Sequence, residues 1–194
     1  MIYLLRHGEI PQSKPRRMVG QRDLPLTEQG RAQAAWWGQE LAGHEFAVIV
    51  ASDLARCRQT AELVVPNRQV RLDPAWREVD LGDWTGLSQE EIKARFPGQW
   101  EERGANLGHH RTAGGETFAE AAARALPALE ALAGVSGDAL VITHSGVMRA
   151  LLCEALGMPL GNLLRLEVDY AGLCLLERQP TRWVMRGFNL RPEV

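Results

Sequence analysis

The chain opens with Ile2-Tyr3-Leu4-Leu5-Arg6-His7-Gly8-Glu9, an apolar run that ends abruptly at a cation and an imidazole. Four apolar residues so close to the start of a chain are typical of a buried β-strand. The glycine after His7 ends the strand and lets the backbone approach a ligand closely. We therefore expect Arg6 and His7 at the carboxyl end of a strand, where open α/β sheets bind their ligands. The stretch predicts that His7 is a nucleophile and that Arg6 holds the anion it attacks.

The composition limits the classes of protein to which the chain can belong. Its 194 residues, 45% hydrophobic and 24% charged, indicate one globular domain with room for an insertion. A net charge of −2 argues against nucleic acid or an anionic membrane as a partner. Three cysteines without a CxxC spacing predict reduced thiols, and no apolar run approaches the ~20 residues of a membrane-spanning helix. We expect a cytoplasmic protein, and the oligomeric state stays open.

Strand and helix patterns alternate along the rest of the chain. Apolar runs that predict strands cover residues 46–51, 70–72, 138–143, 163–168 and 173–176, and residues 182–186 complete a hairpin. Helical patterns cover residues 27–42, 54–64, 88–95, 117–133 and 147–156. Ser52-Asp53 is the expected N-cap of the second helix, and Pro127 is expected to kink or break the fourth. The alternation predicts an α/β fold built on a parallel sheet.

Two stretches without a clear period are expected around the site. Residues 8–26 carry three prolines and four basic residues directly after His7, so we expect this loop to cover or line the site. A solvated basic loop is the alternative. The chain is expected to form a single domain spanning 1–194. An insertion at about residues 79–115, which is polar and Gly-rich from 97 on, is expected to cover its active site. His109-His110 is interpreted as a solvated pair, because no third metal ligand is in view.

Five polar residues stand where such a sheet gathers its ligands, at strand ends, at a helix first turn or in an irregular loop. They are Arg6, His7, Arg56, Glu78 and His144. Two arginines and two histidines suit a phosphoryl dianion, because guanidinium groups pair with phosphate oxygens and keep their charge. A neutral imidazole can attack phosphorus, and the acid of Glu78 can protonate the leaving alkoxide. Arg58 lies about 200° around the helix from Arg56, so both cannot face one pocket.

Several blocks, in order along nearly the whole chain, resemble the histidine phosphatase superfamily in its phosphoglycerate-mutase-like branch. They are Leu5-Arg6-His7-Gly8-Glu9, Asp23-Leu24-Pro25-Leu26-Thr27 with Gly30, Ser52 to Ala61, Arg77 to Leu87, Gly114-Gly115-Glu116-Thr117 and Thr143 to Arg149. The resemblance implies a three-layer α/β/α sandwich whose sheet is mostly parallel with one antiparallel strand.

The same resemblance implies a role for each residue of the set. His7 is the phosphorylated nucleophile, and Glu78 first protonates the leaving group and then activates water. The transferred phosphoryl group is bound by Arg6, Arg56 and His144. Further candidates for binding phosphate or substrate are Ser13, where relatives usually carry Asn, Gln21 in the loop, and Ser145 through its backbone N–H. Ile10 departs from the Thr or Ser usual in the family.

The expected activity is that of a metal-independent phosphomonoesterase acting on a small phosphorylated metabolite, with α-ribazole 5′-phosphate as one candidate. No Walker-type loop and no Asp-rich magnesium cluster is present in the sequence, so we expect no metal and no cofactor. The stretch after residue 87 lacks the arginine pair of cofactor-dependent phosphoglycerate mutases, although such a mutase stays an alternative. A non-catalytic phosphate-binding module and a metal-dependent hydrolase using the histidines with Glu9 or Asp83 also stay open.

Overall fold

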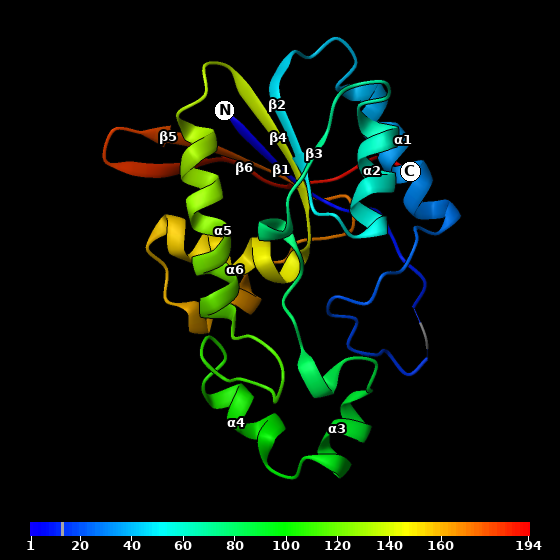
Figure 1. The fold of residues 1–194 in the computed structure, drawn as a ribbon, viewed down its shortest axis with the longest axis vertical. Coiled ribbons are helices and arrows are strands. Elements are labelled where there is room, and N and C mark those ends of the chain that lie inside the picture. The colour runs from blue at the N-terminus through cyan, green and yellow to red at the C-terminus, as the bar shows by residue number, and fades with distance from the viewer. Residues whose placement is uncertain (13) are drawn as a thin grey trace.

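A computed structural model describes residues 1–12 and 14–194, and they build one six-stranded mixed sheet (Figure 1). Its strands, in sheet order, are β3 (Arg71–Leu72), β2 (Phe46–Ala51), β4 (Asp138–Thr143), β1 (Ile2–Arg6), β5 (Leu173–Gln179) and β6 (Arg182–Leu190). β1 to β4 run parallel to one another, and β5 is antiparallel to both of its neighbours. The expected sheet, mostly parallel with one antiparallel strand, is confirmed.

Helices cover both faces of the sheet and complete the three-layer sandwich (Figure 1). Four long helices form the outer layers: α1 (Glu28–Glu40) and α2 (Ala55–Val64) on one face, and α5 (Phe118–Ala133) and α6 (Ser145–Leu156) on the other. Successive strand residues alternate between the two layers. Leu4 packs in the core with α5 and α6, whereas Leu5 packs in the core with α1 and α2. An apolar run such as Leu4-Leu5 is buried on both sides, as a central parallel strand requires.

The remaining elements are short. They are the 3₁₀ turns η1 (Pro74–Trp76), η2 (Gly82–Trp84) and η3 (Leu160–Arg165), and the short helices α3 (Gln89–Arg95) and α4 (Gln99–Ala105). Ser88 and Glu91 form the expected capping box of α3. In Figure 1, α3 and α4 form a separate lobe below the sheet, in green. The organisation as one domain with an insertion at about 79–115 stays a prediction.

Three local predictions differ from the structure. The strand predicted at 163–168 is wrong: Leu163 is buried and Leu166 is half-buried, whereas Leu164 and Arg165 are exposed, which is the three-residue spacing of the 3₁₀ turn η3. The N-cap of α2 is Leu54 and not Ser52-Asp53. α5 runs unbroken through Pro127. Pro127 lies on the exposed face of the helix, where water can hydrate the carbonyl group that loses its partner.

Candidate active site

The first candidate residue, His7, is almost completely buried at the end of β1 and lines a cavity of about 340 Å³. The backbone beside it is tight, because a Cβ on Gly8 would collide with the carbonyl oxygen of Gly30 at the start of α1. Nδ1 of His7 lies 2.7 Å from the carbonyl oxygen of Gly8, so Nδ1 carries the proton and donates it. Burial, followed by the charges of Arg6 and Arg56, holds the pKa of His7 well below its usual range. The neutral ring therefore offers Nε2 as a free lone pair.

Arg6 presents a cation beside this imidazole. One amino group of its guanidinium donates to the carbonyl oxygen of Val168 at 2.7 Å. The central carbon of the guanidinium lies 3.8 Å from the centre of the Tyr170 ring. Its Nε is buried and has no hydrogen-bond partner among the residues the structure describes. Burial lowers the pKa of Arg6 to about 10, which still leaves it charged at neutral pH. Arg6 therefore holds an unused buried donor and a positive charge for an anion in the cavity.

Arg56 and His144 form a pair behind the nucleophile. Nε of Arg56 donates to Nδ1 of His144 at 3.1 Å, and Nε2 of His144 lies 2.8 Å from Oγ of Ser52. Because arginine only donates, Nδ1 accepts and the proton of His144 is on Nε2. Burial, followed by the charge of Arg56, holds the pKa of His144 well below its usual range. The rings of His144 and His7 lie edge to face with their centres 5.1 Å apart.

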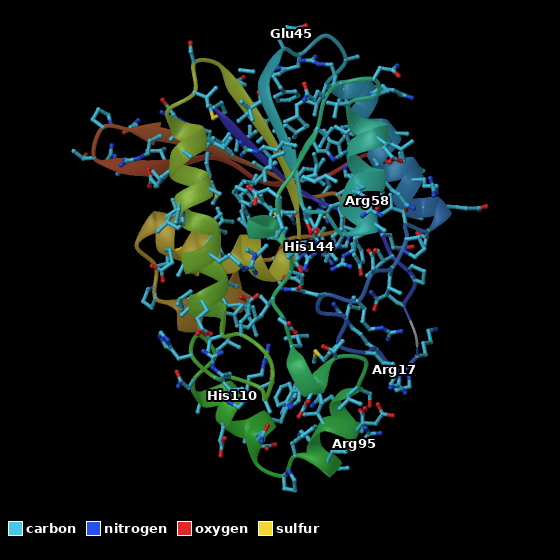
Figure 2. The ribbon with its side chains drawn as sticks, viewed as in Figure 1. Arg17, Glu45, Arg58, Arg95, His110 and His144 are labelled. Atoms are coloured by element: carbon cyan, nitrogen blue, oxygen red, sulfur yellow. The ribbon has the colours of Figure 1, made fainter. Side chains whose placement is uncertain are left out.

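The guanidinium of Arg56 also ties the loop before α1 to the site. Its two amino groups donate to the carbonyl oxygens of Arg22 at 2.7 Å and Gly20 at 2.9 Å. With the bond to His144, three of the five N–H groups of an arginine are used, and two remain for an anion. In Figure 2, His144 lies at the centre between the sheet and the α3–α4 lobe, with Arg58 on α2 and Arg17 nearer the lobe.

Glu78 lies at the N-terminus of α6. Its carboxylate accepts hydrogen bonds from the backbone N–H groups of Gly146 at 3.2 Å and Val147 at 3.1 Å, and from Val79 at 3.0 Å. The amides at a helix N-terminus attract negative charge, which explains why the side chain docks there. Glu78, Ser145 and Gly146 line the same cavity as His7. The acid and the nucleophile therefore share one space.

The structure brings together most of the residues expected from the sequence. Arg6, His7, Arg56, Glu78 and Ser145 line the cavity, and His144 is buried directly behind them. Gln21 is not part of the cavity wall; its side chain donates to the backbone carbonyl oxygen of Glu78 at 3.0 Å. Ser13 lies outside the described residues. The long loop contributes Ile10, Gln12 and residues 16–20 to the wall.

Further lining residues were not expected from the sequence, among them Tyr170, Arg103 and Arg149. Tyr170 lies in a turn and not at the end of a strand or the start of a helix, so no periodic sequence pattern predicts its place in the site. Its neighbour Ala171 adopts a positive φ of 51°, a conformation that a non-glycine side chain disfavours and that strand and helix patterns do not reveal. Arg149 belongs to a block that resembles the family, which was a usable signal.

No side chains converge as a metal-binding group in the described part of the chain: three or more His, Cys, Asp or Glu residues do not meet there. His109 is exposed, and the ring of His110 packs 5.5 Å from that of Trp84. Among the helices in residues 1–12 and 14–194, none is both long and apolar enough to cross a membrane.

Comparisons with known proteins match nearly the whole chain. The model of the family described as "Histidine phosphatase superfamily (branch 1)" matches residues 2–191. A glucosyl-3-phosphoglycerate phosphatase of Mycolicibacterium vanbaalenii is 33% identical over 175 residues, 83% of this chain and 76% of that protein. A protein of Erwinia tasmaniensis named "Probable phosphoglycerate mutase GpmB" is 29% identical over 96% of this chain and 89% of its own. The crystal structure of the α-ribazole phosphatase from Shigella flexneri superposes with a TM-score of 0.87 at 25% identity, over 98% of this chain and 96% of that one.

Proposed function

The chain belongs to branch 1 of the histidine phosphatase superfamily, and from this premise we propose that it hydrolyses a small phosphorylated metabolite through a phosphohistidine on His7, without a metal ion. The observation that carries the proposal is the hydrogen bonding of His7, which leaves one ring nitrogen free. Its Nδ1–H is committed to the carbonyl oxygen of Gly8, and its Nε2 lone pair is free in a cavity also lined by Arg6, Arg56 and Glu78. Hydrolysis of a phosphomonoester through a phosphohistidine needs this combination of nucleophile, cations and acid.

In the first step, Nε2 of His7 attacks phosphorus, and the bond between phosphorus and the ester oxygen breaks. The Nε2–P bond forms as the alcohol leaves, and Glu78 supplies the proton that the alkoxide needs. Charge on the phosphoryl oxygens is stabilised by Arg6 and Arg56, which retain unused N–H groups. The bond from Nδ1–H to Gly8 stabilises the positive charge that the phosphorylated ring acquires.

In the second step, water replaces the alcohol. Glu78, now ionised, takes a proton from the water as its oxygen attacks phosphorus, and the Nε2–P bond breaks. Phosphate leaves, His7 regains its lone pair, and Glu78 regains its proton.

The substrate is proposed only as a class. The relatives include phosphatases named for glucosyl-3-phosphoglycerate and for α-ribazole, and these names denote different organic groups. α-Ribazole 5′-phosphate is therefore one candidate among small phosphorylated metabolites. A phosphoglycerate mutase is the second candidate, because a relative that matches this chain over 89% of its own length is named as a probable phosphoglycerate mutase.

A phosphate-release screen tests the proposal. The purified protein, with excess chelator, is offered α-ribazole 5′-phosphate, glucosyl-3-phosphoglycerate, 2- and 3-phosphoglycerate and p-nitrophenyl phosphate, with His7→Ala as the control. A phosphatase releases phosphate from at least one ester, and the control releases none. Interconversion of the phosphoglycerates without net phosphate release would instead establish a mutase. Loss of activity in chelator, restored by metal, would contradict the metal-independent mechanism.

A further inference from the structure

The cavity wall carries more positive charge than one phosphoryl group requires. Among the described lining residues there are six arginines and one carboxylate, that of Glu78. Arg6 and Arg56 serve the phosphoryl group, and Arg17 is paired with Glu91 at 2.6 Å. The arginines then left over are Arg16, Arg103 and Arg149. A substrate with a single anionic group leaves most of this charge unmatched.

Arg103 is the cation that stands out among these three. It lies on α4, its side chain is half-buried, and none of the described residues accepts a hydrogen bond or forms an ion pair with it. Burial lowers the pKa of Arg103, and no carboxylate opposes that effect. Arg149, by contrast, donates to the carbonyl oxygen of Leu166 at 2.6 Å, and Arg16 is exposed.

Two other arginines near the cavity have carboxylate partners. Arg111 pairs with Glu120, and Arg124 pairs with Glu116 at 2.7 Å. A half-buried cation without a partner is unfavourable, because water solvates it less and no anion replaces the lost hydration. An anionic group that enters the cavity removes this cost.

The aromatic neighbours of Arg103 leave its donors free. Its guanidinium carbon lies 5.5 Å from the centre of the Trp100 ring and 5.9 Å from that of Phe118, and Phe118 also lines the cavity. A cation over an aromatic ring uses the face of the guanidinium, whereas its N–H groups lie in the plane and point outward. These two rings take up no hydrogen-bond donor of Arg103, so its N–H groups are available to a carboxylate.

We propose that Arg103 binds a second anionic group, a carboxylate in the simplest case, on the organic part of the substrate. The inference rests on the proposed phosphatase function and narrows it to phosphomonoesters whose alcohol portion is itself anionic. Arg16, exposed at the cavity wall, adds to the positive potential that draws such a substrate in. The α4 helix then contributes specificity, while the end of β1 contributes the chemistry.

Matched esters test this proposal on the intact protein. The probes are 3- and 4-phosphoryloxybenzoate and the two corresponding benzamides. The benzamides have nearly the same size and leaving group, but a neutral amide replaces the carboxylate. We expect the wild-type protein to favour at least one benzoate over its amide by roughly tenfold to a hundredfold in kcat/KM, mainly through KM. Arg103→Gln should bring that ratio close to one, and Arg103→Lys should keep part of it. Arg95→Gln, an exposed arginine on neighbouring α3 outside the cavity wall, should keep all of it.

The outcomes separate the two proposals. Equal turnover of benzoates and benzamides by the wild-type protein would overturn the anion-binding role without touching the phosphatase function. A benzoate preference that survives in Arg103→Gln would remove the assignment to Arg103. If neither kind of ester, nor p-nitrophenyl phosphate, were hydrolysed, the phosphatase proposal itself would fail and this inference with it. The wild-type ratio decides whether a second anionic group is recognised. If Arg103→Gln folds poorly, Arg103→Lys, which keeps the charge, decides the assignment: a benzoate preference left unchanged would contradict it and a reduced one would support it.

Discussion

The Nε of Arg56 donates a hydrogen bond of 3.1 Å to Nδ1 of His144, so the first turn of α2 and the end of β4 are joined inside the site. The bond sets the tautomer of His144 and turns the guanidinium of Arg56 toward the cavity. Arg58, two residues further on, is exposed and donates to the carbonyl oxygen of Asp53. The two arginines of one helix therefore have separate environments.

Arg56 and Arg58 form a matched pair for mutation. Arg56→Gln should lower kcat/KM for p-nitrophenyl phosphate by roughly 10²- to 10³-fold, because it removes charge and donors from the transition state. Arg58→Gln should stay within about twofold, since its side chain faces away from the cavity. Steady-state kinetics of both variants, with thermal unfolding as a check on folding, measure the difference. Equal losses in the two variants would contradict the placement of Arg56.

Glu78→Gln should slow poor leaving groups far more than good ones. An alkoxide needs a proton as it departs, whereas p-nitrophenolate does not, so only the alkyl ester depends on the acid. We expect a loss of about 10²-fold or more for an alkyl phosphate and a loss of about tenfold or less for p-nitrophenyl phosphate. Single-turnover rates of phosphate transfer to the enzyme isolate this step. The same loss for both esters would remove the proton-donor role.

The two buried histidines should make stability depend on pH. Their pKa values are held well below the usual range, chiefly by burial. Below about pH 6.5, and down to the lower pKa values of the folded protein, these histidines bind protons in the unfolded chain but not in the folded one. Their contribution to the free energy of unfolding is therefore fully present above about pH 6.5 and is lost as the pH falls. The slope approaches at most about 1.4 kcal/mol per pH unit for each histidine.

Urea unfolding from pH 7.5 to 5.5 measures this slope. His7→Asn, which does not titrate, should show a smaller slope than the wild-type protein, whatever its absolute stability. An unchanged slope would mean that His7 takes up its proton equally in the folded and unfolded states.

The framework of the site follows directly from sequence patterns. Apolar runs that stop at Arg6-His7 and at His144 are buried central strands, and their continuous hydrophobicity reports burial on both faces. The parallel arrangement then brings both strand ends to one edge, so the pairing of the two histidines is predictable. The apolar run 163–168 misled because Leu163 and Leu166 are three residues apart, a spacing that a short run cannot distinguish from a strand.

The cavity wall opposite the strands is less predictable. Tyr170 is positioned by a turn in which Ala171 has a positive φ, and the backbone N–H of Ala171 donates to the carbonyl oxygen of His7 at 3.0 Å. Arg103 lies on α4, a helix of seven residues that begins after Gly98 with a φ of 82°. Neither feature has a periodic signal, because tertiary contacts and not local propensity determine them.

Tyr170 should position Arg6 through its ring. The guanidinium of Arg6 lies 3.8 Å from the ring centre, and the Tyr170 hydroxyl accepts a hydrogen bond from Gln12 at 2.5 Å. Tyr170→Leu removes the stacking and should lower kcat/KM by roughly three- to thirtyfold. Tyr170→Phe keeps the ring and should stay within about threefold. If the phenylalanine variant lost as much as the leucine variant, the hydroxyl and not the ring would matter.

The central claim is the covalent step on His7, and rapid-quench trapping tests it most directly. The protein is mixed with a ³²P-labelled phosphomonoester that it hydrolyses, quenched in alkali within milliseconds, digested, and the labelled peptide sequenced. We predict label on His7 that is stable in base, lost in acid, formed at least as fast as phosphate is released, and absent in His7→Ala. Phosphate release at the full rate with no label on the protein at any time would contradict the account and show that water attacks the substrate directly.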